Sequence, residues 1–218
     1  MSFKNYFPLH FMSRTQLLLL LIAAVSAITI VVFNLDKDHL VNEFDNNLAL
    51  QNGDLVFRKG RSVESQLVLF SDRESDYSHV GIIYMIEDEA YVIHTVPDES
   101  ESSIDYIKME KIEEFFNSEK ASKGSVLRTK TEYISFALLA AQKAKWFYDR
   151  KIIFDDAFDL KTEDKLYCTE LVWKAYQENG VDLVQGKFDK LFLPISKGDM
   201  IFPSSLLKSH YLNEIYKF

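Results

Sequence analysis

The chain has 218 residues, 47% of them hydrophobic and 14% aromatic, which suits one folded domain of ordinary size plus a short additional segment. Acidic residues number 33 against 25 basic ones, so the formal net charge is −8. A surface of this sign repels polyphosphate, which argues against nucleic acid as a partner. It also offers no basic cluster for anionic lipid head groups.

The strongest pattern near the N-terminus is an apolar run at residues 17–33, interrupted only by one serine and one threonine. Its length lies at the short end of the range for a membrane-spanning helix. A cleavable signal peptide is the alternative, because residues 25–27 resemble a cleavage site, but the apolar run continues past that point. We therefore expect residues 1–34 to form an N-terminal segment with a transmembrane anchor.

The charges around this run predict its orientation. Lys4 and Arg14 precede the run, and acidic residues follow it directly. This asymmetry favours a cytoplasmic N-terminus and places the remainder of the chain outside the cytoplasm, in the periplasm of a Gram-negative cell. Residues 35–52 are polar and are expected to form a linker to a domain at 53–218.

The first predicted elements of that domain are strands. Gly-Asp at 53–54 opens a strand at 55–57, and β-branched and aromatic runs at 79–86 and 90–96 surround an acidic turn, which predicts a β-hairpin. The other expected elements, in chain order, are a helix near 63–70, a strand at 104–109, a helix near 112–116, a strand at 125–128, helices at 134–148 and 168–179, a strand at 200–202 and a short helix after Pro203. Mixed order with mostly antiparallel strands indicates an α+β fold.

The chain has a single cysteine, Cys168, at the predicted start of the helix at 168–179. One cysteine cannot form an internal disulfide, and a buried small hydrophobic residue is its ordinary role. A thiol at a helix N-terminus, however, is close to the positive end of the helix dipole, which stabilises the thiolate and is expected to lower the pKa. This position suits a nucleophile.

Two of the five histidines are candidates for the base that such a nucleophile requires. His79 and His94 both fall in the predicted hairpin, and they share a face of the sheet if the hairpin loop holds an even number of residues. His79 would then exchange a proton with Cys168, and His94 would orient the His79 ring. Two structural histidines on a half-buried sheet are the alternative reading.

Zinc binding is a further possibility for one cysteine and two histidines. The chain contains no CxxC or HExxH motif and no fourth ligand at a fixed spacing, so we expect neither a metal nor a cofactor. The Ser205-x-x-Lys208 pattern is too short to indicate a serine hydrolase.

Four phrases, in this order, resemble the NlpC-type papain-like superfamily and, within it, the circularly permuted YiiX and YaeF group of amidase-like proteins. The phrases are GDLVF at 53–57, YSHVGI at 77–82, YVIH at 91–94 and YCTELVW at 167–173. The histidine motif precedes the cysteine motif, as in the permuted branch. The resemblance implies a permuted papain-like fold with an antiparallel sheet and packed helices over residues 53–218.

The resemblance also implies roles for individual residues. Cys168 matches the nucleophile and His79 the general base, whereas His94 stands where many relatives have a carboxylate. Tyr77 and Tyr167 flank these positions in the sequence and are candidates for holding an oxyanion together with the Cys168 backbone N–H. The expected activity is hydrolysis of an amide or ester through a thioester, with cell-wall peptide or lipid-like substrates. A non-catalytic lipid- or peptide-binding module on the same fold is the alternative.

Overall fold

The computed structural model describes residues 44–97, 104–190 and 198–218, which belong to one compact unit, Val41–Phe218. The predicted membrane anchor at 17–33 lies outside these ranges. Within them, no helix combines the length and the apolar character needed to cross a bilayer.

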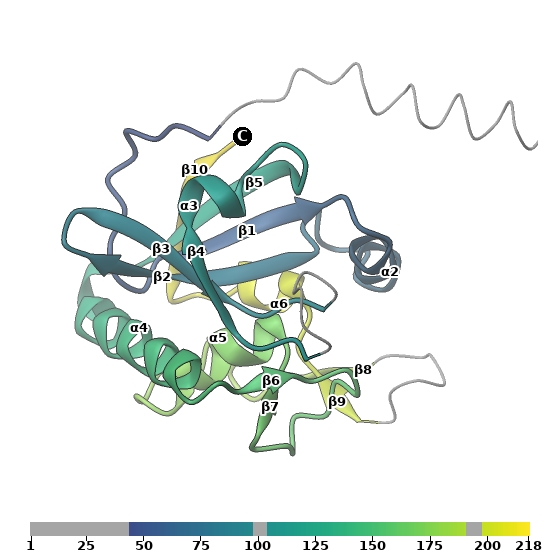
Figure 1. Ribbon diagram of the computed structural model, residues 1–218. Helices are drawn as coiled ribbons and strands as arrows, with labels where there is room; N and C mark the ends of the chain where they lie inside the picture. Colours follow the sequence, from purple (N-terminus) through teal and green to yellow (C-terminus); the bar gives the residue numbers. More distant parts are fainter. Residues whose placement is uncertain (1–43, 98–103, 191–197) are drawn as a thin grey trace, which may run out of the picture. The chain divides into compact units, whose positions relative to one another are not determined.

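The centre of the domain is a six-stranded sheet with the strand order β10–β5–β1–β2–β3–β4, in which every neighbouring pair is antiparallel (Figure 1). A two-residue turn, Glu87 and Asp88, joins β2 to β3. The strands are β1 (Leu55–Gly60), β2 (His79–Ile86), β3 (Glu89–His94), β4 (Lys108–Lys111), β5 (Ala121–Thr129) and β10 (Leu212–Lys217).

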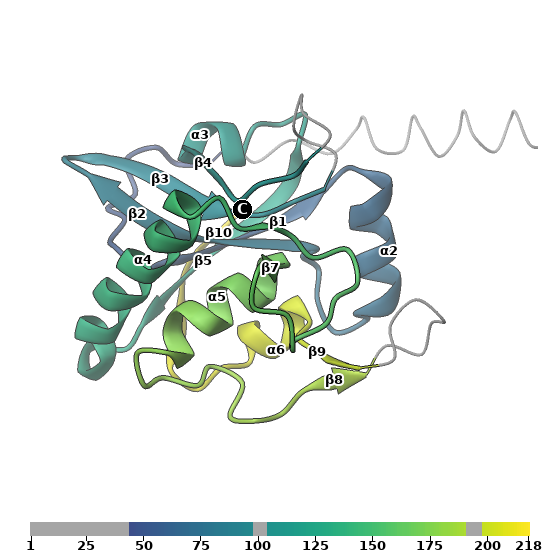
Figure 2. The same ribbon diagram turned by 60° about the horizontal axis from the view of Figure 1, so that its bottom comes forward.

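Helices cover both faces of the sheet, and this explains why its central strands are apolar on both sides. Figure 2 shows α4 (Ile134–Asp149), α5 (Cys168–Gln177) and α6 (Pro203–Leu207) on one side, and α3 (Ile112–Phe115) on the other. In β1, Leu55 and Phe57 join the core under α4 and α5, whereas Val56 joins the smaller core under α3. All three side chains are fully buried, which contributes about 2 kcal/mol each.

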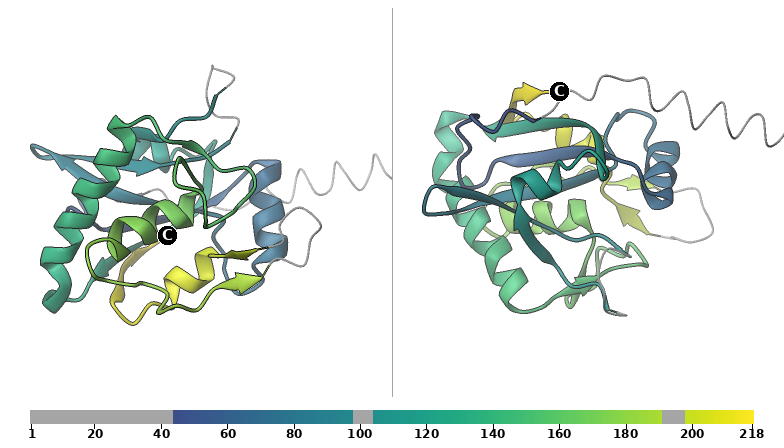
Figure 3. Two further views of the ribbon diagram at one scale, coloured as in Figure 1. Left: turned by 90° about the horizontal axis from the view of Figure 1, so that it is seen from below. Right: turned by 45° about the horizontal axis from the view of Figure 1, so that its top comes forward.

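Helix α5 is the element that places the cysteine at the edge of the core. It lies between α4 and α6 (Figure 3, left), and its buried stripe comprises Leu171, Val172 and Ala175. Spacing of three and four residues places these side chains on one side of the helix, against β2. The N-terminus of α5 is thereby directed at the end of the sheet where β2 begins.

The predicted hairpin and all five predicted helices are confirmed, as is the antiparallel α+β character of the sheet. The strand expected at 104–109 is wrong in its bounds: β4 begins at Lys108, and Tyr106 forms a single bridge to Ile153. Elements that the sequence did not indicate are the pair β6 (Ile153–Phe154) and β7 (Lys165–Leu166), β8 (Asp189–Lys190), and β10. The helix expected near 63–70 is α2 (Val63–Ser71), and the strand expected at 200–202 corresponds to β9, at Asp199–Met200.

Candidate active site

Cys168 is the first residue of α5, and its surroundings follow from how that helix begins. Tyr167 is the N-cap in an extended conformation, and its backbone N–H donates to Glu170 Oε2 at 3.4 Å. The carboxylate three residues into the helix thus satisfies a donor that the first turn leaves open. The backbone N–H groups of Val80, Thr169 and Cys168 itself lie near the thiol sulfur and favour its thiolate form.

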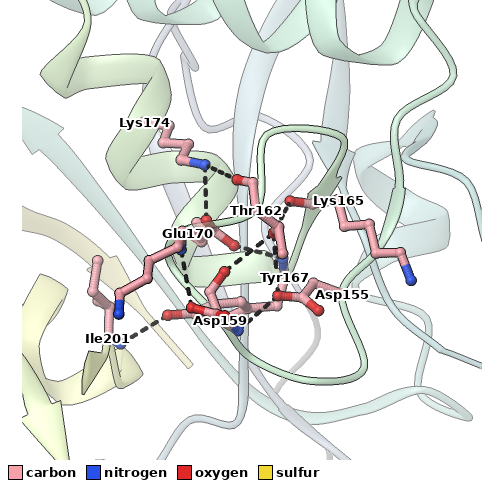
Figure 4. A network of polar contacts seen from close by, with 9 residues as sticks. Asp155, Asp159, Thr162, Lys165, Tyr167, Glu170, Lys174 and Ile201 are labelled. Carbon is pink, nitrogen blue, oxygen red and sulfur yellow. Dashed lines mark hydrogen bonds and ion pairs between the residues drawn. The ribbon is translucent and has the colours of Figure 1, made fainter. Parts of the chain in front are cut away.

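A network of polar contacts holds this first turn in place (Figure 4). Glu170 Oε1 pairs with Lys174 Nζ at 3.0 Å, and Lys174 also donates to the carbonyl of Thr162 at 2.7 Å. Thr162 belongs to the loop between β6 and β7, which folds around the buried carboxylate of Asp155. Burial raises the pKa of Glu170 to about 7, although Lys174 and the Tyr167 N–H act to lower it.

The protonation state of Cys168 differs from the expectation drawn from its helix position. The side chain is partly exposed, but desolvation of the thiol still raises its pKa to about 11, and the nearby N–H groups and the charge of Arg58 only partly oppose this rise. The predicted low pKa is therefore wrong for the free protein, because desolvation of a thiolate outweighs the helix N-terminus here. At neutral pH the sulfur carries a proton.

His79 and His94 meet on the face of the sheet that α3 covers. His79 Nε2 lies 2.8 Å from His94 Nδ1, and both side chains are buried. The pairing of Ile82 with Ile93, continued by one residue, sets Gly81 opposite His94. A Cβ atom at Gly81 would lie 3.1 Å from the His94 Cβ and 2.3 Å from a Val92 methyl group, so this close approach requires glycine.

Phe115 and Arg58 complete the surroundings of the histidine pair. The Phe115 ring packs against both imidazoles, with ring centroids 5.7 Å from His79 and 5.2 Å from His94. The buried Arg58 guanidinium lies over the same ring and donates to the Phe115 carbonyl at 3.0 Å. Burial, followed by the charge of Arg58, holds the pKa of His79 well below its usual value. His79 is therefore neutral and able to accept a proton.

Glu110 is a member of this cluster that the sequence did not single out. Its Oε1 lies 3.1 Å from His94 Nε2, although the ring N–H is poorly aligned with that oxygen. Its Oε2 lies 3.0 Å from Lys120 Nζ. Burial alone would raise the pKa of Glu110, but His94 and Lys120 together bring it down to about 2. Val92 of β3 pairs with Glu110 of β4, and this register places the carboxylate beside His94. The sequence alone does not indicate this position, because it depends on the pairing of the two strands.

The structure brings the predicted residues together in part. His79 and His94 are in contact on the face of the sheet that α3 covers, whereas Cys168 begins α5, which packs against β2 from the other face. Among the described residues, no hydrogen bond joins the Cys168 sulfur to the His79 ring. Catalytic hydrogen bonds are often loose before substrate binds.

The two tyrosines proposed as oxyanion donors have other surroundings. The Tyr167 hydroxyl accepts the backbone N–H of Ile201 at 2.9 Å. Tyr77 is buried against Phe57, and burial raises the pKa of its hydroxyl to about 12. Tyr77 also lines a cavity of about 500 Å³ between β5, β10 and the segment before β2, and neither Cys168 nor the two histidines line it. Across the described ranges, no three His, Cys, Asp or Glu side chains are arranged to hold a metal ion.

Comparison with known proteins identifies the family. The chain belongs to the C92 family of permuted papain-like amidase enzymes, typified by YaeF and YiiX, whose family model matches residues 49–216. The resemblance read from the sequence is thus confirmed at the level of the family.

Two relatives illustrate the similarity. The uncharacterized protein YiiX of Escherichia coli strain K12 is 26% identical over 144 residues, which cover 65% of this chain and 64% of YiiX. The chain thus matches somewhat less than two thirds of the length of that relative. The crystal structure of the metalloprotein YiiX from Escherichia coli O157:H7 superposes with a TM-score of 0.63 at 23% identity, over 78% of this chain and 98% of the other, which shows the shared fold.

Proposed function

We propose that this protein is a cysteine amidase in which Cys168 is the nucleophile, His79 the general base and His94 the group that orients His79. The observation that carries the proposal is the position of Cys168 at the start of α5, because this helix packs against β2, the strand on which His79 is hydrogen-bonded to His94. A papain-like hydrolase needs a thiol and an oriented imidazole at one place.

The proposed reaction is a two-step acyl transfer. His79 Nε2 is engaged by His94, so Nδ1 is the nitrogen that exchanges a proton with the sulfur. As Sγ bonds to the substrate carbonyl carbon, His79 takes the thiol proton and delivers it to the departing amine or alcohol. Water then hydrolyses the thioester and regenerates the thiol. The N–H groups of the first turn of α5 are the donors for the oxyanion, and neither tyrosine hydroxyl is needed.

The thiol of Cys168 and the imidazole of His79 are both neutral before substrate binds, and this determines the step at which the thiolate nucleophile forms. Because burial raises the pKa of Cys168 to about 11, the thiolate is produced during attack rather than stored beforehand. Positive charge that appears on His79 is then stabilised through His94 and the carboxylate of Glu110. This resembles general-base activation of a hydroxyl more than a preformed thiolate–imidazolium pair.

The proposed substrates are cell-wall peptides or lipid-like amides and esters, and the proposed location is extracytoplasmic, anchored by residues 17–33. Membership of an amidase family supports a peptide or peptidoglycan-like substrate. The apolar run and the charges around it support the anchor. A domain held close to a bilayer reaches both kinds of substrate, since each occurs near that surface.

The test is hydrolysis by the purified full chain in detergent micelles, with muropeptides and N-acyl amides as substrates. Cys168→Ala is expected to reduce turnover at least about a thousandfold and His79→Ala about a hundredfold or more, because each removes one partner of the proton transfer. The matched control is His210→Ala, whose ring contacts the Gln185 side chain on an exposed surface. It should behave like the unmodified chain.

Two results would contradict the proposal. Turnover that persists in Cys168→Ala would exclude the thiol as nucleophile. Tight binding of a substrate without turnover by the unmodified chain would instead support a non-catalytic lipid- or peptide-binding module.

A further inference from the structure

The cluster under α3 places three side chains that can exchange protons in one line. It runs from His79 Nε2 to His94 Nδ1 at 2.8 Å, and from His94 Nε2 to Glu110 Oε1 at 3.1 Å. Each neutral imidazole carries one ring proton, so a partner at one nitrogen decides what the other nitrogen can do. The partner at His94 Nε2 therefore influences which nitrogen of His79 carries a proton.

We infer that Glu110 is a positioning residue that accepts the Nε2–H of His94 and thereby fixes the ring form in which His79 acts as a base. This inference rests on the proposed function. With the proton on Nε2, His94 offers a lone pair at Nδ1, which accepts the Nε2–H of His79. His79 then has its own lone pair at Nδ1, available for the thiol proton of Cys168.

The charges around Glu110 keep it in the accepting form. Lys120 Nζ lies 3.0 Å from Oε2, and Arg58 Nη1 lies 3.9 Å from Oε1. The pKa of Glu110 falls to about 2 as a result of His94 and Lys120, so the carboxylate is ionised at any physiological pH. An ionised carboxylate has acceptors only, which leaves the donor role to His94.

The opposite arrangement would disable the base. If a donor faced His94 Nε2, the His94 proton would move to Nδ1 and would be donated to His79 Nε2. His79 would then carry its own proton on Nδ1, facing the thiol, and could not accept another. The same reasoning explains why a carboxylate-to-amide change behind a catalytic histidine slows serine proteases by forcing the wrong tautomer.

A purely structural role for Glu110 is the competing explanation, since its pairing with Lys120 also ties β4 to the segment before β5. Glu110→Gln separates the two. Lys120 can only donate, so it holds the amide carbonyl oxygen and turns the amide NH₂ toward His94 Nε2. Adding Lys120→Met releases the amide to rotate and present its oxygen to His94. A structural role predicts that the double variant is worse than the single one, whereas positioning predicts recovery.

The experiment follows the ring protons directly by ¹⁵N NMR of histidine-labelled full chain in micelles, together with turnover of the best amide substrate. The unmodified chain should show both His79 and His94 protonated at Nε2. Glu110→Gln should move both protons to Nδ1 and reduce kcat about a hundredfold or more, with KM little changed. Glu110→Gln with Lys120→Met should restore the Nε2 forms and at least a tenfold part of the lost kcat.

The matched control is the exposed pair on the same two strands, Lys111 and Glu89, whose Nζ and Oε1 atoms lie 3.0 Å apart. Glu89→Gln, alone or with Lys111→Met, should leave the ring protons and kcat unchanged. His94 tautomers that stay the same in Glu110→Gln, or a double variant no better than the single one, would overturn the inference.

Two further outcomes keep this inference distinct from the proposed function. If Glu110→Gln does not fold, the unmodified chain decides: a proton on His94 Nδ1 overturns the inference, and one on Nε2 supports it. If the tautomers behave as expected but the unmodified chain hydrolyses nothing, the proposed function fails, whereas the assignment of the ring protons stands.

Discussion

The thiol of Cys168 is subject to two opposed effects of its position. The first turn of α5 supplies N–H donors that stabilise a thiolate, whereas burial among the sheet and α5 raises the pKa of the thiol to about 11. Burial has the larger effect, because moving a charge out of water costs more free energy than the interaction with one helix terminus supplies. The single residue is therefore a poor nucleophile until a base removes its proton.

This balance predicts a specific pH dependence of alkylation. Only the thiolate reacts, so the rate of iodoacetamide modification should be low at pH 7 and rise about tenfold for each pH unit until it levels near the pKa of about 11. Mass spectrometry of the intact chain at a series of pH values measures this rate. Cys168 is the only cysteine, so no other thiol contributes. A plateau already reached below pH 8 would show that a thiolate is preformed.

Among the elements, β1 is tied to its neighbours by the first two residues of the GDLVF phrase. Asp54 accepts two hydrogen bonds from Arg128 of β5, at 2.8 and 2.7 Å. The Gly53 carbonyl accepts the hydroxyl of Tyr176, from α5, at 2.6 Å. These contacts give the phrase a structural role: it attaches the strand at the centre of the sheet to β5 and to the helix that carries Cys168.

Gly53 provides a prediction about stability. Its φ is +87°, and a Cβ there would lie 2.4 Å from the Ala137 carbonyl oxygen of α4, so alanine is both strained and overpacked. Gly186 has a similar φ of +68° with no atom within 4 Å of an added Cβ. Gly186→Ala should cost about 1 kcal/mol of unfolding free energy, and Gly53→Ala at least about 3 kcal/mol. Urea unfolding measures both, and equal costs would show that α4 moves aside.

Element by element, the sequence was most informative where periodicity and turn chemistry agree. The hairpin of β2 and β3 combines β-branched and aromatic runs with a two-residue turn, and its even loop places His79 and His94 on one face as expected. The helix beginning at Cys168 combines an apolar stripe with a glycine stop. In each case local pattern and tertiary packing favour the same structure.

The elements that escaped prediction depend on contacts between distant segments. Strand β10 pairs with β5 at the sheet edge, and most of its side chains are exposed, so it lacks the apolar alternation of a half-buried strand. Glu110 resembles any surface carboxylate in the sequence, and only the pairing of β4 with β3 sets it beside His94. The raised pKa of Cys168 likewise depends on burial, which a helix-start position does not report.

At the scale of the whole molecule, the proposed topology places the domain outside the cytoplasm and the N-terminus inside. Ten residues, 34–43, separate the apolar run from Phe44, the first residue described. Fully extended, this linker spans at most about 35 Å. Under the proposed topology, Phe44 would therefore lie within about 35 Å of the end of the apolar run.

The single cysteine makes this topology testable with a membrane-impermeant maleimide on intact cells. In a Cys168→Ser background, Asp88→Cys at the exposed hairpin turn should be labelled from outside, and Ser2→Cys only after lysis. The Ser2→Cys label should remain on the full-length mature chain, because the apolar run is expected to be retained. Reversed labelling would overturn the orientation, and loss of the Ser2→Cys label from the mature chain would identify residues 17–33 as a cleaved signal peptide.

The burial of Cys168 has a consequence for survival as well as for catalysis. Peroxides oxidise thiolates far faster than thiols, and a pKa of about 11 leaves only ~1 molecule in 10⁴ as thiolate at pH 7. An enzyme working outside the cytoplasm has no glutathione pool to reverse a sulfenic acid, and this chain has no second cysteine to protect the first as a disulfide. Under the proposed function and location, a sulfur that stays protonated until a substrate arrives would give the resting protein resistance to oxidative inactivation.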